Sequence, residues 1–134
     1  MILELLNPFK IFQRKKAQII YYAPLPYNKI LATFTLREEI INIGRAQELP
    51  GNENTLAVKV GANIMIANTS ISTKISRKHA TLSWDAGLKK YKFEDHSKYG
   101  SKINSKCINH DDNIVLNNKD MIDIQGFRFQ ILYS

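Results

Sequence analysis

The chain has 134 residues, a length that suits one domain with a self-sufficient hydrophobic core. Its formal net charge of +7 suits an acidic ligand, such as a phosphopeptide, a nucleic acid or an anionic membrane, without choosing among them. A single cysteine, Cys107, excludes an intrachain disulfide, and no apolar run approaches the ~18 residues of a membrane-spanning helix.

Residues 1–16 are predicted to form an N-terminal extension to a domain that spans residues 17–134. The apolar part of this extension precedes Arg14-Lys15-Lys16, which is the reverse of the order in a secretory signal. We therefore expect no export and no membrane partner. Pro8 breaks any helix there, so two interpretations of this segment stay open. It either docks on the domain or on a partner, or it forms a disordered tail.

Short β-strand patterns dominate from residue 17 onward. Turn residues separate them, and Asp85-Ala86-Gly87 predicts a hairpin. Many short strands at about 8–12 residue spacing, with no amphipathic helix, predict an all-β sandwich. Residues 46–63 are turn-rich and predict a long connection, either a plain surface insertion or a loop that sets specificity. The expected strands are 17–22, 40–43, 64–66, 79–84, 90–94, 102–104, 114–116, 121–124 and 127–131.

Three short segments at the ends of these runs carry candidate ligand-binding side chains. They are Gly44-Arg45, Ser76-Arg77-Lys78-His79 and Ser97-Lys98-Tyr99-Gly100-Ser101. Arginine offers a planar fork of donors, serine a short hydroxyl donor and lysine a point charge. This combination indicates a site for a doubly charged phosphate.

These segments resemble the forkhead-associated (FHA) family of phosphothreonine-binding domains. The family pattern is Gly-Arg, then Ser-Arg-x-His, then Ser-x-Asn-Gly-Thr-x-x-Asn, and the chain matches it in order at residues 43–45, 75–80 and 95–104. The resemblance covers roughly residues 17–134. It implies an FHA-type β-sandwich of two mainly antiparallel sheets with ligand loops at one end. It also implies binding of a phosphothreonine-containing protein, with no catalysis, no cofactor and no metal.

The resemblance implies that some of the matching residues contact the ligand. Arg45 and Ser76 would be the primary phosphate contacts, Lys98 a further one, and Arg77 would reach the phosphate or the peptide backbone. Gly100 would let backbone N–H groups point inward at the phosphate.

Three further matches are expected to support the site rather than to touch the ligand. Gly44 precedes the primary arginine, His79 would brace the loops from behind, and Asn104 would tie a turn. Tyr99 departs from the pattern, because most members carry there an Asn that binds the ligand backbone. The tyrosine is expected to pack over the peptide or to fill a gap.

The Ser97-Lys98-Tyr99-Gly100 variant is similar to nibrin-type FHA domains, which belong to an adaptor of DNA double-strand-break repair. This narrower likeness predicts a nuclear signalling adaptor in the DNA-damage response, with a cytoplasmic location as the second option. Lys98, Arg77 and Lys102 are expected to lie around the opening of the phosphate site, so acidic residues are expected to flank the phosphothreonine.

Two other functions remain open, nucleic-acid binding and a degenerate FHA domain that acts as a structural or dimerisation module. Nucleic acid is favoured as a secondary partner by the basic run Arg14-Lys15-Lys16 and by the aromatic residues that alternate with lysines in residues 89–93. However, Tyr91 and Phe93 share one strand face, which core packing also explains.

Two chemical alternatives have weaker support. Ser76, His79 and Asp95 have the residue types of a hydrolase triad, but no nucleophile elbow surrounds the serine. Cys107 and His110, even with His96 added, fall short of the four ligands of a structural zinc site.

Overall fold

The computed structural model describes residues 14–48 and 56–134. This part of the chain forms twelve β-strands and no helix, and so contains no helix that could cross a membrane. The all-β prediction is confirmed. The strands are β1 Ala17–Tyr22, β2 Ile30–Leu36, β3 Ile40–Ala46, β4 Ala57–Val60, β5 Asn63–Ala67, β6 Ala80–Asp85, β7 Lys90–Asp95, β8 Ser101–Ile103, β9 Lys106–Ile108, β10 Asn113–Val115, β11 Met121–Ile124 and β12 Phe127–Tyr133.

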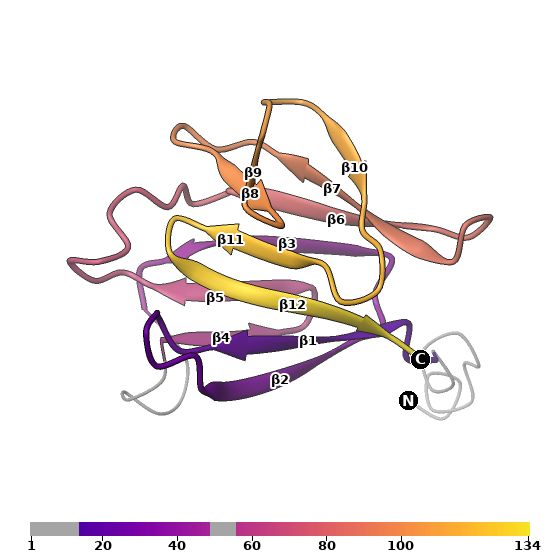
Figure 1. Cartoon of the computed structure of the whole chain (residues 1–134), viewed down its shortest axis with the longest axis horizontal. Coiled ribbons are helices and arrows are strands. Elements are labelled where there is room, and N and C mark those ends of the chain that lie inside the picture. Colours follow the sequence, from indigo (N-terminus) through magenta and orange to yellow (C-terminus); the bar gives the residue numbers. More distant parts are fainter. Residues whose placement is uncertain (1–13, 49–55) are drawn as a thin grey trace, which may run out of the picture.

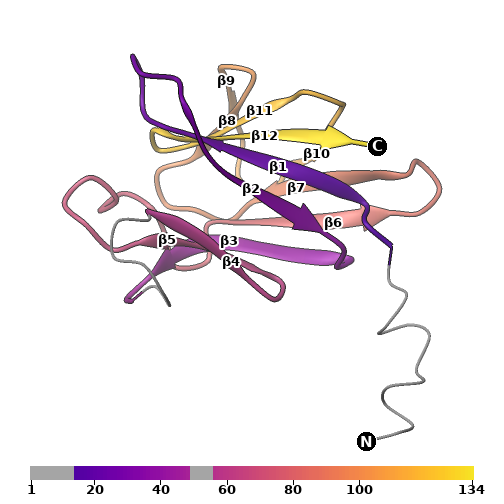
Figure 2. The same ribbon diagram turned by 90° about the horizontal axis from the view of Figure 1, so that it is seen from below.

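The strands form two sheets that pack face to face, as the two layers in Figure 2 show. One sheet has the order β2-β1-β12-β11-β8-β9, and the other has the order β10-β7-β6-β3-β5-β4. Neighbouring strands are antiparallel except for β3 and β5, which run parallel. The predicted sandwich of two mainly antiparallel sheets is therefore confirmed.

Alternation along the strands builds the core between the sheets. In β7 every second residue is buried, so that Tyr91 and Phe93 are fully enclosed while Lys90 and Lys92 face outward. The aromatic residues of this segment are therefore core residues, as their shared strand face predicted. The next inward position is Asp95, which places a buried carboxylate at the end of β7.

The structure contains three strands that the sequence analysis missed, β2, β4 and β9. The expectation that residues 46–63 form one long connection is wrong, because β4 lies within this stretch and pairs with β5. Residues 49–55 of that stretch lie outside the described residues, as does Pro8. The start of β2 is exposed and β9 is only three residues long, so neither shows a clear period-two pattern.

The three motif segments meet at one end of the sandwich. Figure 1 shows this end on the left, where β3, β5 and β7 finish and β6 begins, while the β6–β7 hairpin lies at the opposite end. The connections after β5 and β7 bring residues 68–79 and 96–100 together there. The sheet pairing of β3 with both β5 and β6 fixes the distance between these connections.

Candidate functional site

Gly44 lies inside β3 and not at its end, because the strand continues to Ala46 and pairs with β5. A Cβ atom at this position would lie 1.8 Å from the backbone oxygen of Arg77. The neighbouring Arg45 N–H donates to the backbone oxygen of Ser76 at 3.1 Å. Glycine is therefore required here because the segment 76–77 crosses directly over the strand.

The side chain of Arg45 is half-buried, and its guanidinium makes one hydrogen bond to the residues that the structure describes. Its Nη1 donates to Asn68 Oδ1 at 3.2 Å, which orients the guanidinium from one side. A pocket of about 540 Å³ lies against this guanidinium and is lined by Arg45, Ala46, Gln47, Asn68 and Arg77. Asn68 was missed by the sequence analysis, since it follows β5 as an ordinary turn residue.

Ser76 links two of the three segments. Its Oγ accepts a hydrogen bond from the backbone N–H of Lys98 at 3.2 Å, so the hydroxyl proton remains available to a ligand. Its carbonyl oxygen accepts the N–H of Arg45 at 3.1 Å. A single residue thus fixes the spacing between the arginine and the lysine.

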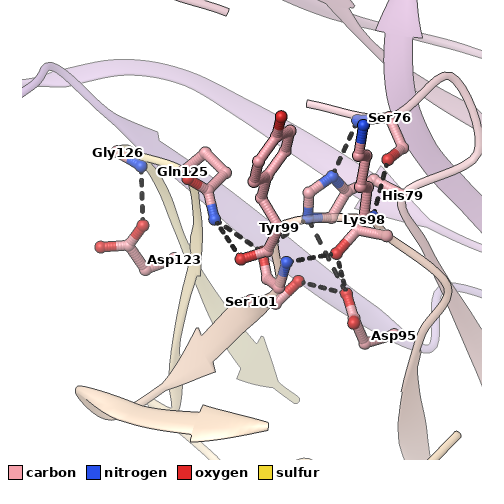
Figure 3. Close-up of polar contacts among 11 residues, drawn as sticks. Ser76, His79, Asp95, Lys98, Tyr99, Ser101, Asp123, Gln125 and Gly126 are labelled. Carbon is pink, nitrogen blue, oxygen red and sulfur yellow. Dashed lines mark hydrogen bonds and ion pairs between the residues drawn. The ribbon is translucent and has the colours of Figure 1, made fainter. Parts of the chain in front are cut away.

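His79 is buried behind these loops, and both of its ring nitrogens are occupied. Nδ1 accepts from the backbone N–H of Ser76 at 3.1 Å, and Nε2 donates to the backbone oxygen of Gly100 at 3.0 Å (Figure 3). Neither nitrogen is hydrogen-bonded to the Ser76 hydroxyl, so the geometry is not that of a hydrolase triad. The ring instead joins the second and third segments from the interior side.

Burial lowers the pKa of His79 below its usual 6.5, against the opposing effects of the Gly100 carbonyl and the Asp95 carboxylate. A neutral ring is also what the hydrogen bonds require, because Nδ1 must keep a lone pair to accept from Ser76.

This lowered pKa predicts that acid destabilises the domain. As the pH falls below about 6.5, His79 takes up a proton more readily in the unfolded chain than in the folded one. The free energy of unfolding therefore decreases as the pH falls from 6.5 to the lower pKa of His79 in the folded state. In an NMR titration, the His79 ring should titrate below pH 6.5, and the melting temperature should fall over the same interval. The variant His110→Ala, which changes an exposed histidine, should keep this fall in melting temperature. The variant His79→Gln should lose the part of the fall that the protonation of His79 causes. A ring of His79 that titrates above 6.5 would contradict the account.

A buried hydroxyl and carboxylate network shapes the loop from Ser97 to Ser101. Asp95 Oδ1 accepts from the hydroxyls of Ser97 at 2.7 Å and Ser101 at 2.8 Å. The Gly100 N–H donates to Ser97 Oγ at 2.7 Å. The loop therefore uses the Gly100 N–H itself internally, and the expectation that backbone N–H groups near Gly100 point at a phosphate stays a prediction. Gly100 has φ +94, so the position does need the left-handed conformation.

Tyr99 projects outward between two lysines. The side chain is 55% exposed, so it does not fill a gap in the interior. Lys98 Nζ lies 5.5 Å and Lys74 Nζ 5.9 Å from the centre of its ring, both within cation–π range. Gln125 Nε2 donates to the backbone oxygens of Tyr99 at 3.0 Å and Gly100 at 2.9 Å, which fixes the base of the loop. The sequence motif pointed to neither Lys74 nor Gln125.

Asn104 lies away from the loops, at the turn between β8 and β9. Its φ is +51, its Nδ2 donates to Asp120 Oδ1 at 2.9 Å, and its Oδ1 accepts from the Met121 N–H at 2.9 Å. The side chain thus ties this turn to the start of β11.

The sequence profile of the FHA domain family matches residues 41–125, which contain all three motif segments. The chain belongs to the FHA family. No curated protein matches the chain at a significant level.

Solved FHA domains share the fold at low sequence identity. An FHA domain of an Arabidopsis thaliana hypothetical protein is 19% identical with a TM-score of 0.58, and the match covers 88% of this chain and 85% of that one. The N-terminal FHA domain of S. cerevisiae Rad53p, solved with a phosphothreonine peptide, is 14% identical with a TM-score of 0.62 over 88% and 93% of the two chains. The FHA domain of the CT664 protein from Chlamydia trachomatis is 17% identical with a TM-score of 0.58 over 88% and 97%.

The site of this FHA domain is basic. In residues 14–48 and 56–134, none of Arg45, Arg77, Lys74 and Lys98 forms an ion pair with a carboxylate. Guanidinium and ammonium groups of this kind can bind a dianion with charge-assisted hydrogen bonds.

Proposed function

We propose that this FHA domain binds phosphothreonine peptides through the loops that carry Arg45, Ser76 and Lys98, and that it serves as an adaptor for kinase-modified partners. The observation that carries the proposal is the double link through Ser76, whose carbonyl and hydroxyl oxygens hold the backbones of Arg45 and Lys98. The Rad53p domain, which has the same fold, was solved with a phosphothreonine peptide.

Each group has a distinct task in the proposed complex. A phosphothreonine carries about −1.5 to −2 charge and three acceptor oxygens. Arg45 forks onto two of these oxygens while Asn68 holds the other side of its guanidinium. Ser76 donates its free hydroxyl proton to an oxygen, and Lys98 and Arg77 neutralise the remaining charge. His79 positions the loops and takes no part in bond making, so the domain binds without catalysis.

An oriented library of phosphothreonine peptides, followed by calorimetry on the selected sequence, tests this function. A matched peptide with unmodified threonine should not bind measurably. Single-stranded DNA should compete poorly at 0.15 M salt, since non-specific nucleic-acid binding weakens steeply as salt rises. Equal binding of the modified and unmodified peptides would refute the proposal. Phosphate-independent self-association would instead support a dimerisation module.

A second candidate, binding of an anionic chain such as nucleic acid, has one specific observation in its favour. A pocket of about 610 Å³ at the opposite end of the sandwich is lined by Arg14, Lys15, Lys16, Trp84 and Lys89, together with Tyr133 and Ser134. Lys16 Nζ already covers the Trp84 ring at 5.8 Å, which limits base stacking there. Direct DNA binding that is lost in Lys89→Ala but kept in Arg45→Ala would assign nucleic acid to this pocket.

The lysines around Tyr99 predict a preference for acidic residues beside the phosphothreonine. Exposed charges contribute about 0.2–1 kcal/mol each, so acidic flanks should improve affinity several-fold and the gain should fade above ~0.3 M salt. Two peptides that differ only in acidic or neutral flanks can be titrated at two salt concentrations. The gain should shrink in Lys98→Ala and persist in Lys89→Ala, which removes a lysine at the far end. Equal affinities at low salt would contradict this expectation.

A nuclear location and a role in DNA-damage signalling stay predictions from the Lys98-Tyr99 variant. The peptide sequence that the library selects bears on them directly, because it defines which phosphorylated proteins can be partners.

A further inference from the structure

A mixed cluster of histidine and carboxylate side chains lies on the outer face of the β7 sheet. Glu94, His96 and Asp111 each offer one ligand atom, and these atoms all lie within 4.8 Å of one another. Two of the three histidines in the chain gather here, because His110 Nε2 lies 3.5 Å from Asp111 Oδ1. We propose that this cluster binds a divalent metal ion of the zinc type, independently of phosphopeptide binding.

The strand register explains why these residues meet. Glu94 lies at an outward position of β7, and His96, two residues later, follows the same face. Asn113 of β10 pairs with Glu94 in the antiparallel ladder, so Asp111, two residues earlier, falls opposite His96. The backbone N–H of Asp111 also donates to the backbone oxygen of Asp95 at 3.3 Å, which holds the turn beside β7.

A hydrogen-bond chain outside the cluster orients the His96 ring. Thr81 Oγ1 lies 3.0 Å from His96 Nε2 and, at 3.4 Å, farther from Asn42 Oδ1, so the hydroxyl contacts the ring on the side away from the cluster. The other ring nitrogen, Nδ1, faces Glu94 Oε1 at 3.7 Å. Histidines that bind metals commonly donate their second N–H to such a partner, and this fixes the ligating nitrogen.

A ring nitrogen and two carboxylates converge in this cluster. The two carboxylates repel one another, and 3.7 Å between His96 Nδ1 and Glu94 Oε1 is too long for a direct N–H···O hydrogen bond. Zinc bonds to nitrogen and oxygen are about 2.0–2.2 Å long, so one ion can bridge atoms at that separation. The Asp111 side chain is 76% exposed and can turn toward the ion, and water would complete the coordination of the three protein ligands.

Calorimetric titration of the tag-free chain with zinc chloride tests the site. The wild type should bind one zinc ion per chain, and its melting temperature should rise with zinc. His96→Ala and Asp111→Asn should weaken zinc binding by at least about tenfold, and Thr81→Val, which removes only the partner of Nε2, by about tenfold. Cys107→Ser is the matched control, because it removes an exposed thiol that could bind zinc elsewhere, and it should leave the affinity unchanged.

Three results would overturn the metal site. They are the absence of saturable binding to the wild type, unchanged affinity in His96→Ala, and loss of binding in Cys107→Ser. Melting curves in EDTA show whether each variant is folded. Asp111→Asn alters a largely exposed side chain and therefore gives a decision even where His96→Ala unfolds.

Discussion

Replacing Arg45 with alanine should weaken phosphothreonine-peptide binding by more than ~2 kcal/mol, about thirtyfold or more, because the phosphate loses a charge-assisted fork of hydrogen bonds. The stability of the folded domain should change little, since among the described residues the guanidinium makes one hydrogen bond, to Asn68 at the surface. Calorimetry with the selected peptide measures the first effect, and the melting temperature measures the second.

Two variants make the Arg45 experiment specific. Arg14→Ala removes the same charge at the other end of the sandwich and should keep wild-type affinity. Arg45→Lys keeps the charge but loses the planar fork, so it should recover only part of the binding. Wild-type affinity in a folded Arg45→Ala protein would exclude this residue from the ligand site.

Replacing Gly44 with alanine should destabilise the domain and disable the site together. The new Cβ would lie 1.8 Å from the Arg77 backbone oxygen and 2.6 Å from its carbonyl carbon, so the strand or the loop must move. Overpacking of this kind costs up to about 3 kcal/mol. Because the displaced segment carries Ser76, peptide affinity should fall as well. Denaturant unfolding and calorimetry on the same samples measure both effects.

Gly87→Ala is the matched control for Gly44→Ala. Its Cβ would meet only the end of the Asp85 side chain at 3.3 Å, so stability and affinity should change little. A Gly44→Ala protein with the stability of Gly87→Ala would show that the segment 76–77 does not press on β3 as the structure has it.

The sandwich was predictable from the sequence because buried and exposed residues alternate along its longer strands. Tyr91 and Phe93 show this pattern, and they are core residues in the structure. The pattern failed where it is short or absent, as in β9, and where turn residues surround a real strand, as around β4. The predicted strand 40–43 stops before Gly44 because glycine often marks a turn, whereas close packing against Arg77 is the reason for a glycine here.

The candidate site was predictable as a set of residue types but not as a geometry. The motif named Arg45, Ser76 and Lys98, and the structure shows how Ser76 links the other two. Lys74 and Asn68 carry no motif signal, since only the fold brings the β5–β6 connection beside Tyr99 and Arg45. The use of the Gly100 N–H inside the loop likewise depends on three-dimensional contacts with Ser97.

The central claim is that a phosphothreonine is held where the three motif segments meet, and backbone chemical-shift mapping tests it most directly. Adding a phosphothreonine peptide to the isotope-labelled chain should shift the amide signals of residues 44–46, 76–78 and 97–100, and the Arg45 side-chain signal, as one saturable group. The unmodified peptide should leave them in place. Saturable shifts confined to the opposite end, around Trp84 and Lys89, or no shifts at all with a selected peptide, would contradict the account.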